Sequence, residues 1–219
     1  MTSAESRRIN RLHRFERDLW ESGSLLLCGL DEVGRGPLAG PVTACAVVIE
    51  RPLRLEFLDD SKVVTELRRI ALDALIRDQA VAVSVGWADH LEIDSLNILG
   101  ASRLAMHRAL AGLGLTPCRV LVDGPSLPGC AYPQTAIIDG DAKSAAIAAA
   151  SIVAKVARDA FMTQLDTTYP GYGFANNKGY ATSDHLAALN AFGPCPAHRR
   201  SFTPVVQPTF DFAAAGALP

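Results

Sequence analysis

The sequence lacks the cysteine spacing of a zinc site or a redox pair. Its five cysteines stand at positions 28, 45, 118, 130 and 195 of the 219 residues, and none belongs to a C-x-x-C pair. Zinc sites and redox-active thiol pairs both depend on such short spacings. We therefore expect reduced thiols, as in a cytoplasmic protein.

A long apolar run is also missing. The longest uncharged stretch, residues 124–138, contains three prolines and falls short of the roughly 18 residues that a membrane span needs. The N-terminus carries basic residues, but no apolar signal core follows them. We therefore expect a protein with no membrane partner that is not exported.

Neither sign of charge is in excess. The 21 Lys and Arg residues face 23 Asp and Glu residues, for a formal net charge of -2. Proteins that hold nucleic acid by bulk positive potential carry a strong basic excess, so this class is excluded. The 49% hydrophobic content is typical of a globular protein with a sizeable core.

Periodicity predicts an α/β protein. Helical spacing indicates helices within residues 1–22, 65–77, 94–113, 142–164 and 183–191, and short apolar runs indicate strands at 25–30, 42–49, 80–87, 119–122 and 135–138. Strands that first cluster and then alternate with helices predict a mixed β-sheet flanked by helices. We divide the chain into an N-terminal helix (1–22), a catalytic domain (23–165), a helical C-terminal extension (166–205) and a disordered tail (206–219).

Four carboxylates stand where predicted strands end. Asp31 and Glu32 follow the first strand, Asp123 follows the fourth, and Asp141 comes just after the fifth. Acids at the strand ends of an open α/β sheet can converge, and their mutual repulsion favours a divalent cation. Oxygen ligands alone suit Mg²⁺ or Mn²⁺ rather than zinc.

Two of these acids have structural alternatives. Asp123 before Gly124 and Pro125 is more typical of a turn, and Asp141 before a helix is more typical of an N-cap. The pair Asp31 and Glu32 has no such simple explanation. Beside it lies a turn, Gly34, Arg35 and Gly36, whose glycines let a ligand approach the backbone and whose arginine can bind phosphate.

The motifs together resemble the ribonuclease HII family. They are DEVGRGPLAGP (31–41), DSK (60–62), VDG (122–124), GD (140–141), AASIVAKVARD (149–159), KGY (178–180) and HRRSF (198–202). They extend over residues 25–205 in the family's order. One departure is Asn177, where the family often has a histidine, and it puts any charged role at that position in doubt.

The resemblance implies a ribonuclease H-like fold and an endonuclease with four carboxylate ligands. It would hydrolyse the RNA strand of RNA/DNA hybrids and nick duplex DNA 5′ of single embedded ribonucleotides, leaving 3′-hydroxyl and 5′-phosphate ends. Asp31, Glu32, Asp123 and Asp141 would hold two divalent ions, Mn²⁺ or Mg²⁺, with Asp31 as the bridging ligand.

The resemblance also implies the substrate contacts. Gly34, Arg35, Gly36 and Tyr180 would sense the ribose 2′-hydroxyl and the following nucleotide, and Lys62 would contact a phosphate. Ser144 lies in the first turn of the helix that follows Asp141, so we expect it near a phosphate as well. Lys155 is expected to pair with Asp159, and His198 is equally compatible with a structural role or a contact to the substrate backbone.

Two rival functions and one further partner remain open. A type 3 ribonuclease H would share the fold and chemistry but handle isolated ribonucleotides poorly. A catalytically silent nucleic-acid-binding module would be favoured if one of the four acids were an amide, and none is. Residues 207–212 are a candidate docking peptide for a sliding clamp, although we favour a disordered tail there, and we expect a monomer.

Overall fold

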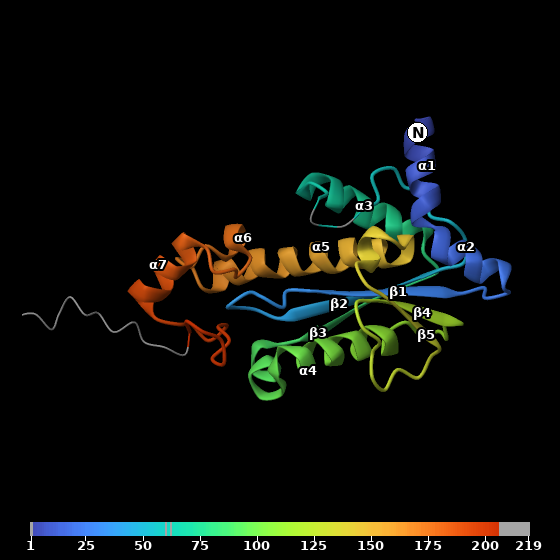
Figure 1. The fold of residues 1–219 in the computed structure, drawn as a ribbon. Coiled ribbons are helices and arrows are strands. Elements are labelled where there is room, and N and C mark those ends of the chain that lie inside the picture. The colour runs from blue at the N-terminus through green and yellow to red at the C-terminus, as the bar shows by residue number, and fades with distance from the viewer. Residues whose placement is uncertain (1, 60, 62, 206–219) are drawn as a thin grey trace, which may run out of the picture.

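The computed structural model describes residues 2–59, 61 and 63–205. Within these residues, five strands form one mixed sheet in the order β3-β2-β1-β4-β5 (Figure 1). The strands are β1 (Leu27–Val33), β2 (Val42–Ile49), β3 (Ala82–Ala88), β4 (Arg119–Asp123) and β5 (Gln134–Ile137). The central strand β1 runs antiparallel to β2 and parallel to β4.

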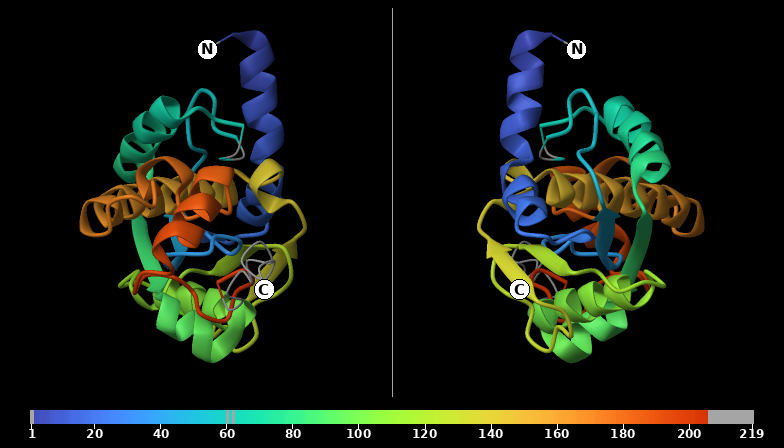
Figure 2. Two further views of the ribbon diagram at one scale, coloured as in Figure 1. Left: turned by 90° about the vertical axis from the view of Figure 1, so that its left-hand side faces the viewer. Right: turned by 90° about the vertical axis from the view of Figure 1, so that its right-hand side faces the viewer.

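Helices cover both faces of the sheet (Figure 2). One face carries α1 (Ser3–Leu12), α2 (Arg14–Glu21), α3 (Glu66–Gln79) and the long α5 (Ala145–Thr168), and the other carries α4 (His90–Ala111). A short 3₁₀ turn, η1 (Gly140–Ala142), precedes α5, while α6 (Phe174–Asn177) and α7 (Ser183–Phe192) form the C-terminal extension. The expected mixed sheet flanked by helices is therefore confirmed.

Alternation along the strands explains the two-sided core. Leu27 on β1 packs with α5 on one face, and Leu30 packs with α4 on the other, because successive side chains of a strand point to opposite sides. All residues of β2 are buried, as expected for a strand covered on both faces. The alanines of α5 let the helix lie close against β1.

The N-terminal segment differs from its prediction. Instead of one helix over residues 1–22, α1 and α2 meet at His13. The His13 ring turns inward, where Nε2 accepts a hydrogen bond from the backbone N–H of Leu53 at 2.9 Å and Nδ1 lies 3.0 Å from the carbonyl oxygen of Ile9. The break therefore has a tertiary cause that helical periodicity does not reveal.

The predictions about membrane spans, the tail and the domain boundaries have different outcomes. In the part of the chain that the structure describes, no helix is both long and apolar enough to cross a membrane. The tail, residues 206–219, lies outside the described residues, and the boundaries between the predicted domains stay a prediction.

Candidate active site

Asp31 and Glu32 are the acids of the central strand. They lie within the last residues of β1 rather than after it, so their side chains point to opposite faces of the sheet. Asp31 is buried on the α5 side, where the hydroxyl of Ser151 and the backbone N–H of Glu32 hydrogen-bond to it. Burial is the main reason that the pKa of Asp31 is raised well above its ordinary value, and the charges of Glu32 and Asp123 raise it further.

Asp123 reaches the same end of the sheet from β4. Val122 pairs with Leu30, so Asp123 follows at the level of Asp31. Its Oδ1 accepts a hydrogen bond of 2.7 Å from the backbone N–H of Gly140. That bond ties the end of β4 to η1, the turn that carries the buried Asp141.

Three separate segments therefore bring the four predicted carboxylates to one end of the sheet. Within the described residues, no three His, Cys, Asp or Glu side chains form a compact metal-ligating group, so the acids converge without closing around one point. The donor set nevertheless fits a hard cation, since it consists of carboxylate oxygens. The charges of Glu32 and Asp123 add to the burial that raises the pKa of Asp31, and a cation would relieve this like-charge repulsion.

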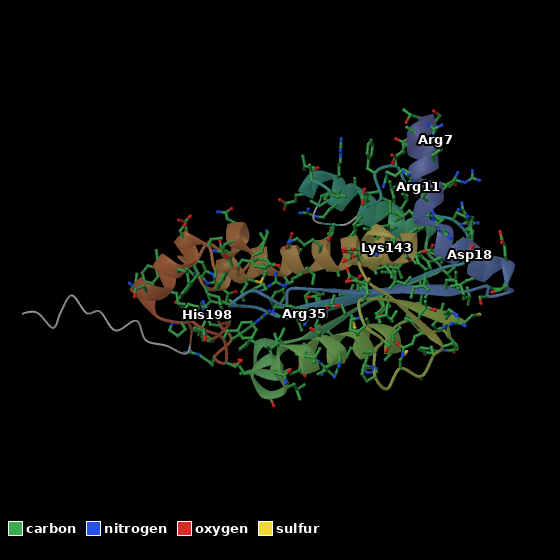
Figure 3. All side chains as sticks on the ribbon, viewed as in Figure 1. Arg7, Arg11, Asp18, Arg35, Lys143 and His198 are labelled. Carbon is green, nitrogen blue, oxygen red and sulfur yellow. The ribbon has the colours of Figure 1, made fainter. Side chains whose placement is uncertain are left out.

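Arg35 lies beside these acids at the end of β1 (Figure 3). Its guanidinium donates to Oε1 of Glu32 at 3.2 Å, and its side chain is 52% exposed. Burial nevertheless raises the pKa of Glu32, with Asp123 adding to the shift and Arg35 opposing it. Arg35 can thus leave Glu32 for a phosphate at little cost, because an exposed ion pair is weak.

The glycine turn is fixed by two buried arginines. Gly34 has a φ of +88°, and a Cβ there would lie 2.1 Å from Nε of Arg158, so no side chain fits. Arg199 donates to the carbonyl oxygens of Gly34 at 2.7 Å and Arg35 at 2.9 Å. Arg199 is fully buried and is a positioning residue that the sequence reasoning did not assign to the site.

Tyr180 joins this turn from the C-terminal extension. A Cβ on Gly36 would lie 3.8 Å from Cε1 of Tyr180, and the tyrosine is 40% exposed. Arg158 lies 6.0 Å from the centre of the Tyr180 ring and donates to the carbonyl oxygen of Lys178 at 3.0 Å. The predicted group of Gly34, Arg35, Gly36 and Tyr180 is thus brought together.

Asn177 has a structural role in this arrangement. It is buried, its side-chain nitrogen donates to the carbonyl oxygen of Tyr172 at 2.7 Å, and its side-chain oxygen accepts from the N–H of Gly179 at 2.8 Å. The neutral amide supplies both a donor and an acceptor. It therefore holds the turn that presents Tyr180 without needing a charge.

The structure does not place Ser144 at the surface. Ser144 is fully buried; its hydroxyl donates to Glu16 at 2.6 Å and caps α5 by accepting from the N–H of Ile147. The expectation of a phosphate contact is therefore not supported, because the hydroxyl faces the protein interior. Lys62, the other predicted phosphate contact, lies outside the described residues.

Other expectations are resolved by the contacts. Lys155 pairs with Asp159 at 2.7 Å, as predicted. His198 is fully buried, with Nε2 lying 3.0 Å from Nε2 of His185 and Nδ1 accepting from the N–H of Cys195. His185 Nδ1 in turn lies 2.8 Å from the carbonyl oxygen of Tyr180. Of the two roles left open for His198, the structure favours the structural one (Figure 3).

Comparisons with known proteins bear on the family and the fold of the chain. A sequence profile described as Ribonuclease HII matches residues 28–205. A Ribonuclease HII of Desulfitobacterium hafniense is 53% identical over 93% of this chain and 78% of its own length. A crystal structure of ribonuclease H2 from Pyrococcus horikoshii superposes with a TM-score of 0.70 at 26% identity, covering 83% of this chain and 96% of its own. A PCNA:RNase HII complex from Archaeoglobus fulgidus gives a TM-score of 0.69 at 25% identity, covering 81% and 95%.

Proposed function

The chain belongs to the ribonuclease HII family, endoribonucleases that hydrolyse the RNA strand of RNA/DNA hybrids, and we propose that it also nicks duplex DNA 5′ of single embedded ribonucleotides. The products would carry 3′-hydroxyl and 5′-phosphate ends. The observation that carries the proposal is the position of Asp31, buried at the end of the central strand beside Asp123 and only three residues before the glycine turn.

The four carboxylates would hold the metal. Asp31, Glu32, Asp123 and Asp141 would supply the oxygen ligands. Asp31 would be the ligand shared between two ions, since it adjoins Glu32 on β1 and lies level with Asp123 on the neighbouring strand β4. Divalent ions, Mn²⁺ or Mg²⁺, supply charge neutralisation and Lewis acidity at the scissile phosphate when bound. The carboxylates are anchored by backbone hydrogen bonds, such as that from Gly140 to Asp123, so their positions are set before substrate binds.

The glycine turn and Tyr180 would recognise the ribose. Gly36 carries no side chain and lies against Tyr180, so a nucleotide can approach the backbone while the exposed ring contacts its sugar. The 2′-hydroxyl is the group that distinguishes RNA from DNA at one position. Arg35 is half-exposed, so its guanidinium could release Glu32 and bind a phosphate oxygen of the substrate instead.

A single-ribonucleotide duplex tests this proposal. With Mn²⁺ or Mg²⁺ present, the wild-type protein should nick 5′ of the ribonucleotide, and Asp31→Asn should lower kcat by about 1000-fold or more because it removes a charged ligand. Asp139→Asn is the control, since it makes the same acid-to-amide change at the N-cap of η1, two residues before Asp141, where the side chain is 76% exposed. Addition of a chelator should abolish nicking by the wild type.

Two outcomes would contradict the proposal. One is a wild-type protein that cleaves hybrids but leaves the single-ribonucleotide duplex intact, which is the behaviour expected of the type 3 alternative. The other is an Asp31→Asn variant that nicks at the wild-type rate. Circular dichroism of both variants would show that a loss of activity is not a loss of folding.

We also propose a protein partner, a sliding clamp, and a cellular compartment. The A. fulgidus relative was solved in a complex with PCNA, which supports clamp docking by residues 207–212 of this chain, a segment outside the described residues. Deletion of 206–219 with clamp binding unchanged would overturn it. We also propose, from the sequence alone, that the protein is a monomer and that it is cytoplasmic. Light scattering would test the oligomeric state, and cell fractionation would test the compartment.

A further inference from the structure

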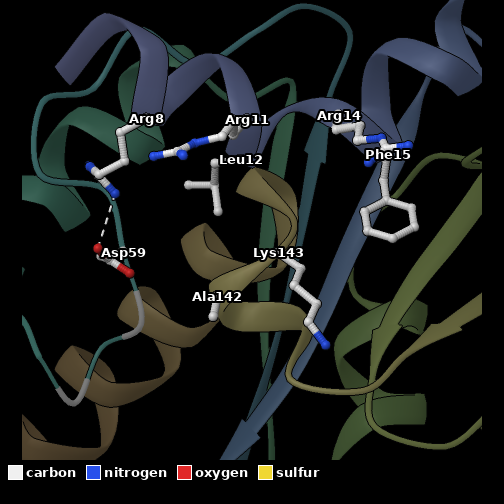
Figure 4. A pocket seen from close by; sticks show the side chains of 8 residues that line it. All are labelled: Arg8, Arg11, Leu12, Arg14, Phe15, Asp59, Ala142 and Lys143. Atoms are coloured by element: carbon white, nitrogen blue, oxygen red, sulfur yellow. Dashed lines mark hydrogen bonds and ion pairs between the residues drawn. The ribbon is translucent and has the colours of Figure 1, made fainter. Parts of the chain in front are cut away.

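A basic pocket lies between the N-terminal helices and η1 (Figure 4). Its volume is about 560 Å³, and its walls are formed by Arg8, Arg11, Leu12, Arg14, Phe15, Asp59, Ala142 and Lys143. Four of these eight side chains are cationic and one is acidic. The pocket therefore concentrates positive charge in a chain whose net charge is -2.

Not all of this charge is already paired. Arg8 donates to Asp59 at 3.0 Å and to Glu5 at 2.7 Å, so its charge is balanced within the protein. Arg11 and Arg14 are exposed and make no hydrogen bond or ion pair with the described residues. Two guanidinium groups thus face the pocket with their donors available.

Lys143 supplies a further cation from the opposite wall. Its Nζ donates to the carbonyl oxygen of Ile138 at 2.7 Å and lies 3.6 Å from the exposed Asp139, while its side chain remains 50% exposed. Figure 4 shows the backbone of Lys143 across the pocket from Arg11 and Arg14, with its ammonium group directed away from the two arginines. Lys143 would reach an anion held by Arg11 and Arg14 only after releasing the Ile138 carbonyl and turning toward them.

The two walls are held together by a buried contact. Oε1 of Glu16 on α2 accepts hydrogen bonds from the hydroxyl of Ser144 at 2.6 Å and from the N–H of Ala146 at 2.9 Å. Both donors lie at the start of α5, directly after the Lys143 wall. This contact fixes the position of α2 against α5, so the pocket exists before any ligand arrives, and little ordering would be needed on binding.

The pocket adjoins the turn that carries one of the proposed metal ligands. Ala142 lines it and follows the buried Asp141 directly on η1. A strand whose scissile phosphate lies at the carboxylates can therefore continue past this turn to the pocket. Because duplexes carry a phosphate charge every few ångströms, a substrate held at the carboxylates presents further phosphates on both sides of the scissile one.

We infer that this basic pocket binds backbone phosphates of the nucleic-acid substrate, on one side of the cleavage position. The inference rests on the proposed function, because the direction of the strand is taken from the carboxylate site. It assigns Arg11 and Arg14, which lie before residue 28 where the family profile begins, to substrate binding. Guanidinium groups suit this task because they bind phosphate oxygens in pairs.

The first test measures binding without cleavage. An all-DNA duplex is the probe, and its dissociation constant is measured by fluorescence anisotropy at several salt concentrations. Replacing both side chains, Arg11→Gln with Arg14→Gln, should weaken binding about tenfold at low salt and reduce the slope of log affinity against log salt by about 2. The matched control is Arg103→Gln on α4, an exposed arginine on the opposite face of the sheet.

The second test locates the contact on the substrate. Duplexes with one central ribonucleotide are shortened from the 5′ side or from the 3′ side, and KM and kcat are measured for the wild type and the double variant. The variant should raise KM on the full duplex, with kcat unchanged, and this difference should vanish when one flank is trimmed but not the other. Such asymmetry is the sign of a contact on one side of the cleavage position.

The outcomes distinguish a failure of the pocket inference from a failure of the proposed function. An unchanged salt slope, or a KM effect that Arg103→Gln reproduces, would overturn the pocket inference while wild-type nicking leaves the proposed function standing. A reduced slope together with no nicking by the wild type would support the pocket and overturn the proposed function. Binding of inorganic phosphate or an acidic peptide at the same arginines, with duplex affinity unaffected, would also overturn the inference.

Discussion

At the scale of single residues, the glycine turn of the site depends on two arginine side chains that are buried in the protein. Arg158 and Arg199 are both fully buried, and burial lowers the pKa of Arg199 to about 9. Their donors are used on carbonyl oxygens, such as those of Gly34 and Ala39, rather than on carboxylates. This explains why sequence reasoning did not assign Arg199: its partners are backbone atoms, which carry no side-chain pattern.

Gly34 gives a prediction at this scale. Gly34→Ala adds the cost of a positive φ, about 1–2 kcal/mol, to a clash with the Arg158 guanidinium, since the new Cβ would lie 2.1 Å from Nε. Gly114→Ala is the matched control, because its φ is +69° and nothing lies within 4 Å of its Cβ position. Urea denaturation should show a larger loss for Gly34→Ala, together with a fall in kcat; equal losses would contradict the role of Arg158.

At the scale of elements, strands were more predictable than helix ends. The strand at 42–49 matches β2 residue for residue, because both of its faces are buried and its apolar run is unbroken. The strand predicted at 25–30 extends as β1 to Val33, since Asp31 and Glu32 continue the ladder despite their charge. The convergence of the four acids could be predicted from the sequence because each lies at the end of a strand or just after one; their role as metal ligands stays a prediction.

The start of α5 shows why helix ends were harder to predict. The helix begins at Ala145, three residues later than expected, because Ser144 is its N-cap and is itself held by Glu16. These two residues are 128 positions apart in the chain. No local pattern around Ser144 reveals such a partner, so its assignment to phosphate binding followed from proximity to Asp141 alone.

Glu16 gives a prediction for this junction. Glu16→Ala would leave the Ser144 hydroxyl and the Ala146 N–H without their buried acceptor, and it should destabilise the protein by about 2–4 kcal/mol. Glu16→Gln keeps the accepting oxygen and should cost far less; burial already raises the pKa of Glu16, which disfavours its charge. Thermal unfolding of both variants would check this, and equal losses of stability would contradict an acceptor role for Glu16.

At the scale of the whole molecule, the near-neutral net charge conceals an uneven distribution of charged side chains. The chain carries a net charge of -2, yet four cationic side chains gather in the basic pocket, which includes Ala142 of η1 but none of the four active-site acids. A neutral total therefore excludes a protein that coats nucleic acid, but it permits one that binds a substrate through local positive charge. Only the folded structure shows this separation.

The C-terminal extension gives the last prediction, which concerns the pH dependence of unfolding. Burial, with the neighbouring His185, lowers the pKa of His198 from 6.5 to about 4. Between these two values the unfolded chain binds more protons than the folded one, so stability falls as pH falls through this range. Because the two neutral rings share one hydrogen bond, protonation of either ring would break the connection from Cys195 to Tyr180.

The expected loss is about 2 kcal/mol between pH 7 and pH 5, measured as the free energy of unfolding in urea. His107→Gln should keep this loss, since His107 lies on α4 away from the pair, with its Nε2 at 3.0 Å from the carbonyl oxygen of Pro128. His198→Gln should reduce it, because the glutamine cannot titrate, even though its stability at pH 7 will be lower. A pH dependence that is identical in the wild type and His198→Gln would show that the acid sensitivity arises elsewhere in the molecule.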